Sequence, residues 1–63
     1  MTTTKVVAAT FKTAKAIEKE LVWWLYVCPE LNPTIIKLNG IYHVVRDFSS
    51  KDHPDTKTIE VAA

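Results

Sequence analysis

The sequence predicts a small α+β protein in which an antiparallel sheet of three to four strands packs on one helix. Three observations predict it. An Asn39-Gly40 turn separates two β-branched and aromatic segments, Pro29 ends an amphipathic segment, and further strand-like segments lie near both ends. The expected order is strand, helix, hairpin, strand. A long N-terminal helix followed by a β-meander is the alternative.

The chain has 63 residues, so residues 1–63 are expected to form one small domain. Chains below about 70–80 residues usually gain stability from disulfides, a metal or a second subunit. Cys28 is the only cysteine, and Cys28, His43 and His53 are not spaced as zinc ligands. We therefore expect oligomerisation, with a homodimer favoured, and no metal or other cofactor.

Composition and charge narrow the class of protein. Hydrophobic residues make up 48% of the chain and the net charge is +1, so the protein resembles a globular domain without a strong field for a polyanion. The longest apolar run, residues 21–28, is shorter than the roughly 20 residues of a membrane span. No secretion signal is recognisable. Together with a free cysteine, these features indicate a cytoplasmic protein with no membrane partner.

Residues 13–27 are predicted to form the helix. Apolar side chains recur at spacings of three and four and form one stripe, which consists of Ala14, Ile17, Leu21, Trp24, Leu25 and Cys28. Pro29 disfavours helical geometry at the residue before it and ends the helix.

The segments at either end are less strongly patterned. Residues 5–11 are predicted to form a strand because Val6, Val7 and Thr10 favour it, although this segment also continues the helical stripe backwards. Residues 56–61 alternate well enough for a last strand, and residues 49–55 are a polar loop.

The hairpin carries apolar side chains on both faces. A two-residue turn at Asn39-Gly40 fixes which side chains share a face. One face carries Leu38, Ile36, Ile41 and Val45 with His43, and the other carries Ile35, Tyr42 and Val44 with Lys37 and Arg46 at its margins. Because the first face is more apolar, we expect the helix to cover it. The second face would then stay open, and an exposed apolar patch usually marks an interface.

The outer side of the helix carries a second apolar group. At about 100° per residue, Trp24 lies on the apolar stripe, whereas Trp23 lies nearly opposite the centre of that stripe, beside Lys19 and one turn from Tyr26. Trp and Tyr are enriched at the energetic centres of protein interfaces. The alternative is that Trp23 lies flat on the surface under the stem of Lys19.

Two short constellations could carry chemistry. His53-Pro54-Asp55 resembles the signature tripeptide of the J-domain co-chaperones, which act on a larger chaperone from a loop between two helices. Here a strand-like segment precedes it, and the tripeptide is also ordinary turn chemistry. Cys28 and His43 could form a thiol–imidazole pair, but Cys28 lies on the apolar stripe. We predict no catalytic residue and no enzyme.

These features predict a non-enzymatic protein-binding module, a homodimer that binds and modulates or inhibits a larger protein. Compact accessory proteins of phages and mobile elements often act this way. The expected partner or dimer residues are Lys19, Trp23, Tyr26, Ile35, Lys37, Tyr42, Val44 and Arg46. The alternative is nucleic-acid binding on a basic and aromatic sheet face formed by Lys37, Tyr42 and Arg46.

Overall fold

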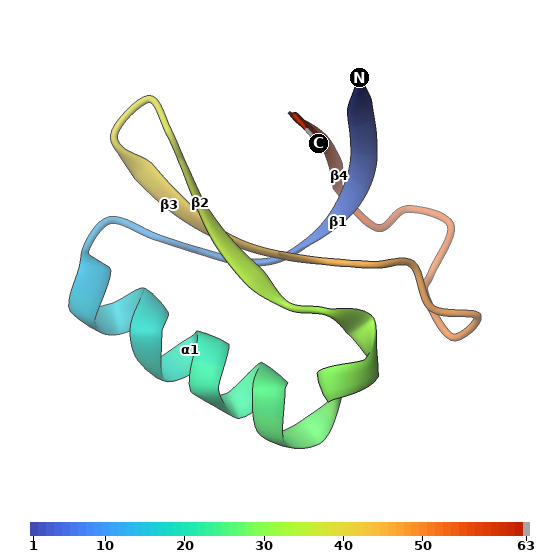
Figure 1. Ribbon diagram of the computed structural model, residues 1–63, viewed down its shortest axis with the longest axis horizontal. Helices are drawn as coiled ribbons and strands as arrows, with labels where there is room; N and C mark the ends of the chain where they lie inside the picture. The colour runs from blue at the N-terminus through green and yellow to red at the C-terminus, as the bar shows by residue number, and fades with distance from the viewer. Residues whose placement is uncertain (63) are drawn as a thin grey trace.

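The computed structural model describes residues 1–62. Its elements in chain order are β1 (Thr2–Phe11), α1 (Ala14–Val27), the 3-10 turn η1 (Pro29–Leu31), β2 (Thr34–Leu38), β3 (Ile41–Arg46) and β4 (Thr58–Ala62). The strands form one antiparallel sheet in the order β2-β3-β1-β4, and α1 lies along one side of it (Figure 1). The predicted α+β fold is confirmed, whereas the long N-terminal helix is wrong because β1 occupies that segment.

Both ends of α1 follow from local chemistry. Thr13 is extended and caps the helix, since its Oγ1 accepts a hydrogen bond from the Ala16 amide at 3.4 Å. At the other end, the Cys28 amide donates to the Trp24 carbonyl at 2.9 Å. Pro29 then begins η1, so the helix ends where the sequence predicts.

The β2–β3 hairpin is confirmed in its turn and its register. Asn39 and Gly40 both have positive φ, 52° and 78°, as a type I′ turn requires. Leu38 pairs with Ile41 across this turn, and the pairing continues to Thr34. The turn residues therefore set which side chains of the hairpin share a face.

The helix covers the face of the sheet opposite to the one predicted. The guanidinium carbon of Arg46 lies 5.0 Å from the centre of the Trp24 ring, so Arg46 points toward α1. Val44, two residues earlier in β3, lies on the same face and is 0% exposed. The prediction that the helix packs on the face of Ile36 and Val45 is therefore wrong.

Strand β1 contains a bulge, which changes the side of the sheet to which its later side chains point. Val7 pairs with Val45 and Ala9 pairs with Val44, so Ala8 is an extra residue on this strand. The extra residue changes the alternation of side chains along β1. As a result Val6 and Phe11, five positions apart, lie on the same face of the sheet as Val44 and Arg46.

The face away from the helix buries side chains without a helix on it. Val45 is 1% exposed there. Val7, Ile36, Ile59 and Val61 share that face by register and are half-buried. The sheet is curled, and the hairpin tip, the start of β1 and the end of β4 lie on the side away from α1 (Figure 1). A bulge bends a strand and increases its twist, so the bulge at Ala8 contributes to this curl.

Candidate protein-binding surface

The C-terminal half of α1 is apolar around its circumference, although only one side of it contacts the sheet. The side chains facing the sheet are buried or half-buried and include Ile17, Leu21 and Trp24. The remaining large apolar side chains are exposed, and they are Val22, Trp23, Leu25, Tyr26 and Val27. We call this group the outer helix surface. Leu25 is 47% exposed, so its predicted place on the buried stripe is wrong. A surface helix normally carries polar residues on its outer side, so the group is unusual.

Two aromatic side chains dominate the outer helix surface. Trp23 is 52% exposed and Tyr26, one turn later, is 88% exposed. Lys19 lies one turn before Trp23 and is also exposed. The sequence therefore placed these three side chains correctly on the outer side of the helix. Large amphipathic rings with a neighbouring cation match the composition of strongly binding interface residues.

Trp23 is supported from below by a second tryptophan. The rings of Trp23 and Trp24 meet edge to face, with centroids 5.1 Å apart and planes at 89°. Edge-to-face pairs are a favoured geometry for aromatic rings because the positive edge of one meets the negative face of the other. This contact limits the conformations open to Trp23. A side chain ordered before binding loses less conformational entropy when a partner covers it.

Trp24 is in turn positioned by Arg46, which lies over its ring. A guanidinium over an aromatic face is favourable, and more so when the pair is shielded from water. Among the residues that the structure describes, two donor atoms in this contact are buried without a hydrogen-bond partner, and they are Nε1 of Trp24 and Nε of Arg46. The stacking geometry of Arg46 therefore rests on its ring contact and on its other nitrogens.

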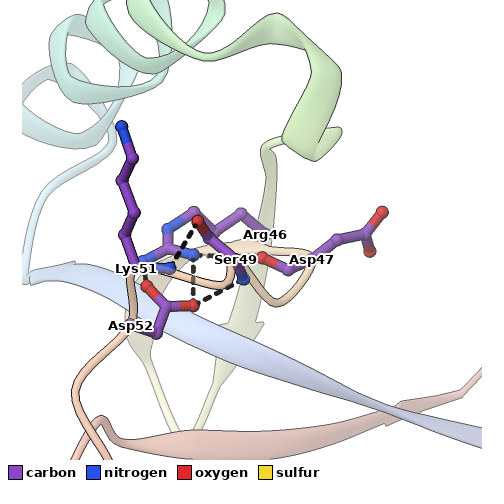
Figure 2. Close-up of polar contacts among 5 residues, drawn as sticks. All are labelled: Arg46, Asp47, Ser49, Lys51 and Asp52. Carbon is purple, nitrogen blue, oxygen red and sulfur yellow. Dashed lines mark hydrogen bonds and ion pairs between the residues drawn. The ribbon is translucent and has the colours of Figure 1, made fainter.

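Those nitrogens join Arg46 to the loop that follows β3 (Figure 2). Nη1 and Nη2 of Arg46 donate to the two carboxylate oxygens of Asp52 at 3.0 and 2.7 Å. Nη1 also donates to the Asp47 carbonyl, and the Ser49 amide donates to Asp52 at 2.7 Å. The hydrogen bonds from Arg46 and Ser49 lower the pKa of Asp52, and the bond to Asp52 raises the pKa of Arg46. This bidentate pair explains how a charged side chain can be 8% exposed.

A second ion pair joins the start of the same loop to β1. Lys5 donates to Oδ1 of Asp47, and the Asn32 side-chain amide donates to Oδ2 at 2.9 Å. These two hydrogen bonds, with Lys5 contributing more, lower the pKa of Asp47. The Asp47 amide donates to the Leu31 carbonyl at 2.8 Å. Asp47 thus connects β1, η1 and the end of β3.

The sheet residues predicted for the interface differ in how far they are exposed. Val44 and Arg46 are buried, so the prediction that they lie on an open face is wrong. The physical reason is that α1 covers them and Asp52 neutralises the arginine. Ile35 and Tyr42 are half-buried on the same face. Lys37 is exposed and holds its Nζ 5.3 Å from the centre of the Tyr42 ring.

Two other candidate groups from the sequence are the pair of Cys28 with His43 and the turn at His53. Oγ1 of Thr10 lies 3.1 Å from Nδ1 of His43 on the face away from α1, whereas Cys28 lies at the end of the helix near Arg46 on the opposite face. Cys28 and His43 therefore form no pair. The turn at His53 is confirmed, because the Thr56 amide donates to the His53 carbonyl at 3.0 Å.

Sequence reasoning missed the buried pair of Arg46 with Asp52. A signal for it exists in the chain, since an arginine at the end of a strand is followed by an acidic loop whose Asp52 has a turn partner at Ser49. Side-chain periodicity does not predict this pair, because Arg46 ends β3 and Asp52 lies six positions later in the irregular loop.

Within residues 1–62, no three His, Cys, Asp or Glu side chains gather closely enough to hold a metal ion. None of the helices in this described part is long and apolar enough to cross a membrane. Comparison of the chain with protein-family models, curated protein sequences and solved structures gives no match.

Proposed function

We propose that this chain is a non-enzymatic protein-binding module that acts as a homodimer and binds a larger protein, whose activity it modulates, through the outer helix surface. The observation that carries the proposal is the group of large exposed apolar side chains on one half of α1, centred on Trp23 and Tyr26. Contiguous apolar surface of this kind is typical of protein interfaces. The edge-to-face support of Trp23 by Trp24 prepares it for binding.

The total surface of the chain supports a partner as well. A folded monomer of this mass exposes about 4,100 Å² according to the usual scaling of surface with mass. This chain exposes 4707 Å². The chain therefore has more surface than a protein of its mass normally leaves in water.

The hollow beside the N-terminal half of α1 gives no support to catalysis. It is open to solvent, and its lining includes Phe11, Ala16, Glu20 and Val22. A catalytic site needs a partly enclosed position where water is excluded and charges are held around a substrate. The proposal therefore assigns the chain a binding role.

Affinity capture with matched variants tests the proposal. The immobilised chain is exposed to a lysate of the cells that encode it, beside the variants Trp23→Ala, Tyr26→Ala and Phe48→Ala. Phe48 is 57% exposed but lies outside the outer helix surface, so its variant is the control. We expect a specific set of proteins to be retained by the original chain and by Phe48→Ala and to be lost with the two helix variants. Equal retention by all four would overturn the proposal.

The structure gives less support to nucleic-acid binding, the alternative function that the sequence suggested. Of Lys37, Tyr42 and Arg46, the arginine is buried and paired with Asp52, and the tyrosine ring is covered by Lys37. Phosphate-driven binding weakens steeply with salt. A titration with single-stranded oligonucleotides at low and moderate salt separates the two functions, and salt-sensitive binding would favour the second.

A further inference from the structure

We propose that a second copy of this chain pairs with the open edge of β2, so that the two sheets join across a two-fold axis at Ile36. This assigns a surface to the homodimer and rests on that part of the proposed function. β2 is the first strand in the sheet order, and within the described residues β3 is its only paired neighbour. An unpaired strand edge is a template for another strand.

The turn determines which backbone groups of β2 are free. Leu38 and Ile41 flank a two-residue type I′ turn, so they exchange backbone hydrogen bonds as a pair. Such pairs alternate along an antiparallel ladder, and the next one is Ile36 with His43. The N–H and C=O groups of Ile35 and Lys37 therefore point away from β3, toward the open edge.

A two-fold pairing about Ile36 satisfies all of these free groups. It sets Ile35 opposite Lys37 of the partner subunit and Lys37 opposite the partner's Ile35. Each of these pairs can exchange both backbone hydrogen bonds, because the groups of both residues point to the edge. Ile36 meets its own copy as the closer, non-hydrogen-bonded pair, which brings two apolar side chains together.

Side chains and charges favour this edge over the other one. Leu38 and Ile41 are 42% and 37% exposed beside it. The cation of Lys37 meets an isoleucine rather than a like charge, and its Nζ is directed over the Tyr42 ring, toward β3. At the opposite edge, two-fold pairing about the middle of β4 would set Glu60 against its own copy, and like charges directly opposite are destabilising.

Disulfide trapping tests the register. In a chain carrying Cys28→Ser, the variant Ile36→Cys would place two thiols on residues whose Cα atoms lie about 4.5 Å apart, which a disulfide can span. Thr34→Cys in the same background is the control, since four residues of offset place it roughly 13 Å from its copy. We expect mild oxidation to convert most of the Ile36→Cys chain to a covalent dimer. In the Thr34→Cys control, less than about a tenth of the chain should form one.

A second variant tests the edge itself. Lys37→Pro removes an N–H that points away from β3, so the hairpin keeps its own hydrogen bonds while the edge is blocked. Light scattering is expected to report twice the 7.1 kDa chain mass for the original chain and the single mass for Lys37→Pro, with unchanged circular dichroism. If Lys37→Pro unfolds, the comparison of Ile36→Cys with Thr34→Cys alone decides whether β2 forms the dimer interface.

The outcomes separate the two proposals. A stable dimer in which Ile36→Cys is no better trapped than Thr34→Cys would overturn pairing through β2 and leave the homodimer standing. A monomer at millimolar concentration would overturn both pairing and homodimer. Binding of a larger protein through Trp23 is measured independently by capture, and neither outcome decides it.

Discussion

Arg46 of β3 and Trp24 of α1 meet between the helix and the sheet, with the guanidinium carbon 5.0 Å from the centre of the indole ring. Trp24 also meets the ring of Trp23, which is exposed on the outer side of α1, edge to face. Asp52 holds the same guanidinium through two hydrogen bonds. The Asp52 carboxylate is thus connected, through the Arg46 cation and the half-buried Trp24 ring, to Trp23, the side chain that we propose meets the partner.

The first prediction concerns the loop that Arg46 holds. In Arg46→Lys, the single ammonium cannot reproduce the bidentate bond to Asp52. The Ser49 amide, which donates to Asp52, should then exchange with solvent about tenfold faster or more, as measured by hydrogen exchange with NMR detection. Asp55→Ala in the same loop is the control, because Asp55 is fully exposed to solvent at 91% and should leave Ser49 unchanged. Unchanged protection in Arg46→Lys would contradict the role of the pair.

The second prediction concerns acid. The pKa values of Asp47 and Asp52 are lowered in the folded state, chiefly by hydrogen bonds from Lys5 and Arg46 respectively. Their contribution to the free energy of unfolding is therefore present above the unfolded pKa of about 4 and lost as the pH falls through the folded values. Urea midpoints should decline between about pH 5 and pH 2.

Substitution of aspartate by asparagine, which has nearly the same shape but no titrating group, tests this prediction. A chain with both Asp47→Asn and Asp52→Asn should show a flatter decline of the urea midpoint with acid, whereas Asp55→Asn should follow the original chain. Within residues 1–62, the ion-pair partner of the Asp55 carboxylate is His53, whose Nδ1 lies 3.6 Å from Oδ2. Parallel curves for the original chain and the double variant would show that other groups control the acid response.

The third prediction compares two aliphatic side chains on α1. Ile17 is 1% exposed and Val22 is 65% exposed. Ile17→Ala should lower the free energy of unfolding by about 2–4 kcal/mol because it leaves a cavity between helix and sheet. Val22→Ala should change it by no more than about 0.5 kcal/mol. Urea denaturation measures both, and a comparable loss in the two variants would mean that the helix packs differently.

The fourth prediction concerns the hairpin turn. Gly40 has a φ of 78°, and a Cβ built there meets no atom within 4 Å. Gly40→Ala should therefore cost only the backbone strain of the left-handed region, about 1–2 kcal/mol. Gly40→Asn should cost less, because asparagine tolerates this region. Thermal unfolding of the two variants checks the order, and a larger loss for Asn than for Ala would refute the backbone explanation.

The sequence was informative where local chemistry decides the structure. Asn39-Gly40 predicted the hairpin and its register because few other residue pairs adopt positive φ together. Pro29 predicted the end of the helix. Helical periodicity placed Trp23 outside and Trp24 inside, since the angle between successive side chains is fixed.

The choice of sheet face could not be predicted in the same way. Counting apolar side chains favoured the face of Val45, because Arg46 counted as a charged margin of the other face. Asp52 removes that penalty from a loop whose position depends on the whole fold. The bulge at Ala8 also breaks the alternation of side chains that a strand pattern assumes. The curled sheet buries Val45 without a second helix. The number of helices therefore did not decide how both hairpin faces are shielded.

The measurement that most directly tests the orientation of α1, on which the outer helix surface depends, is acrylamide quenching of single-tryptophan chains. Trp24→Phe leaves Trp23 as the only indole, and Trp23→Phe leaves Trp24. We expect Trp23 to be quenched several times more efficiently than Trp24, whose Nε1 is shielded from solvent. Equal quenching, or stronger quenching of Trp24, would show that the helix is rotated and that Trp23 is not the exposed side chain.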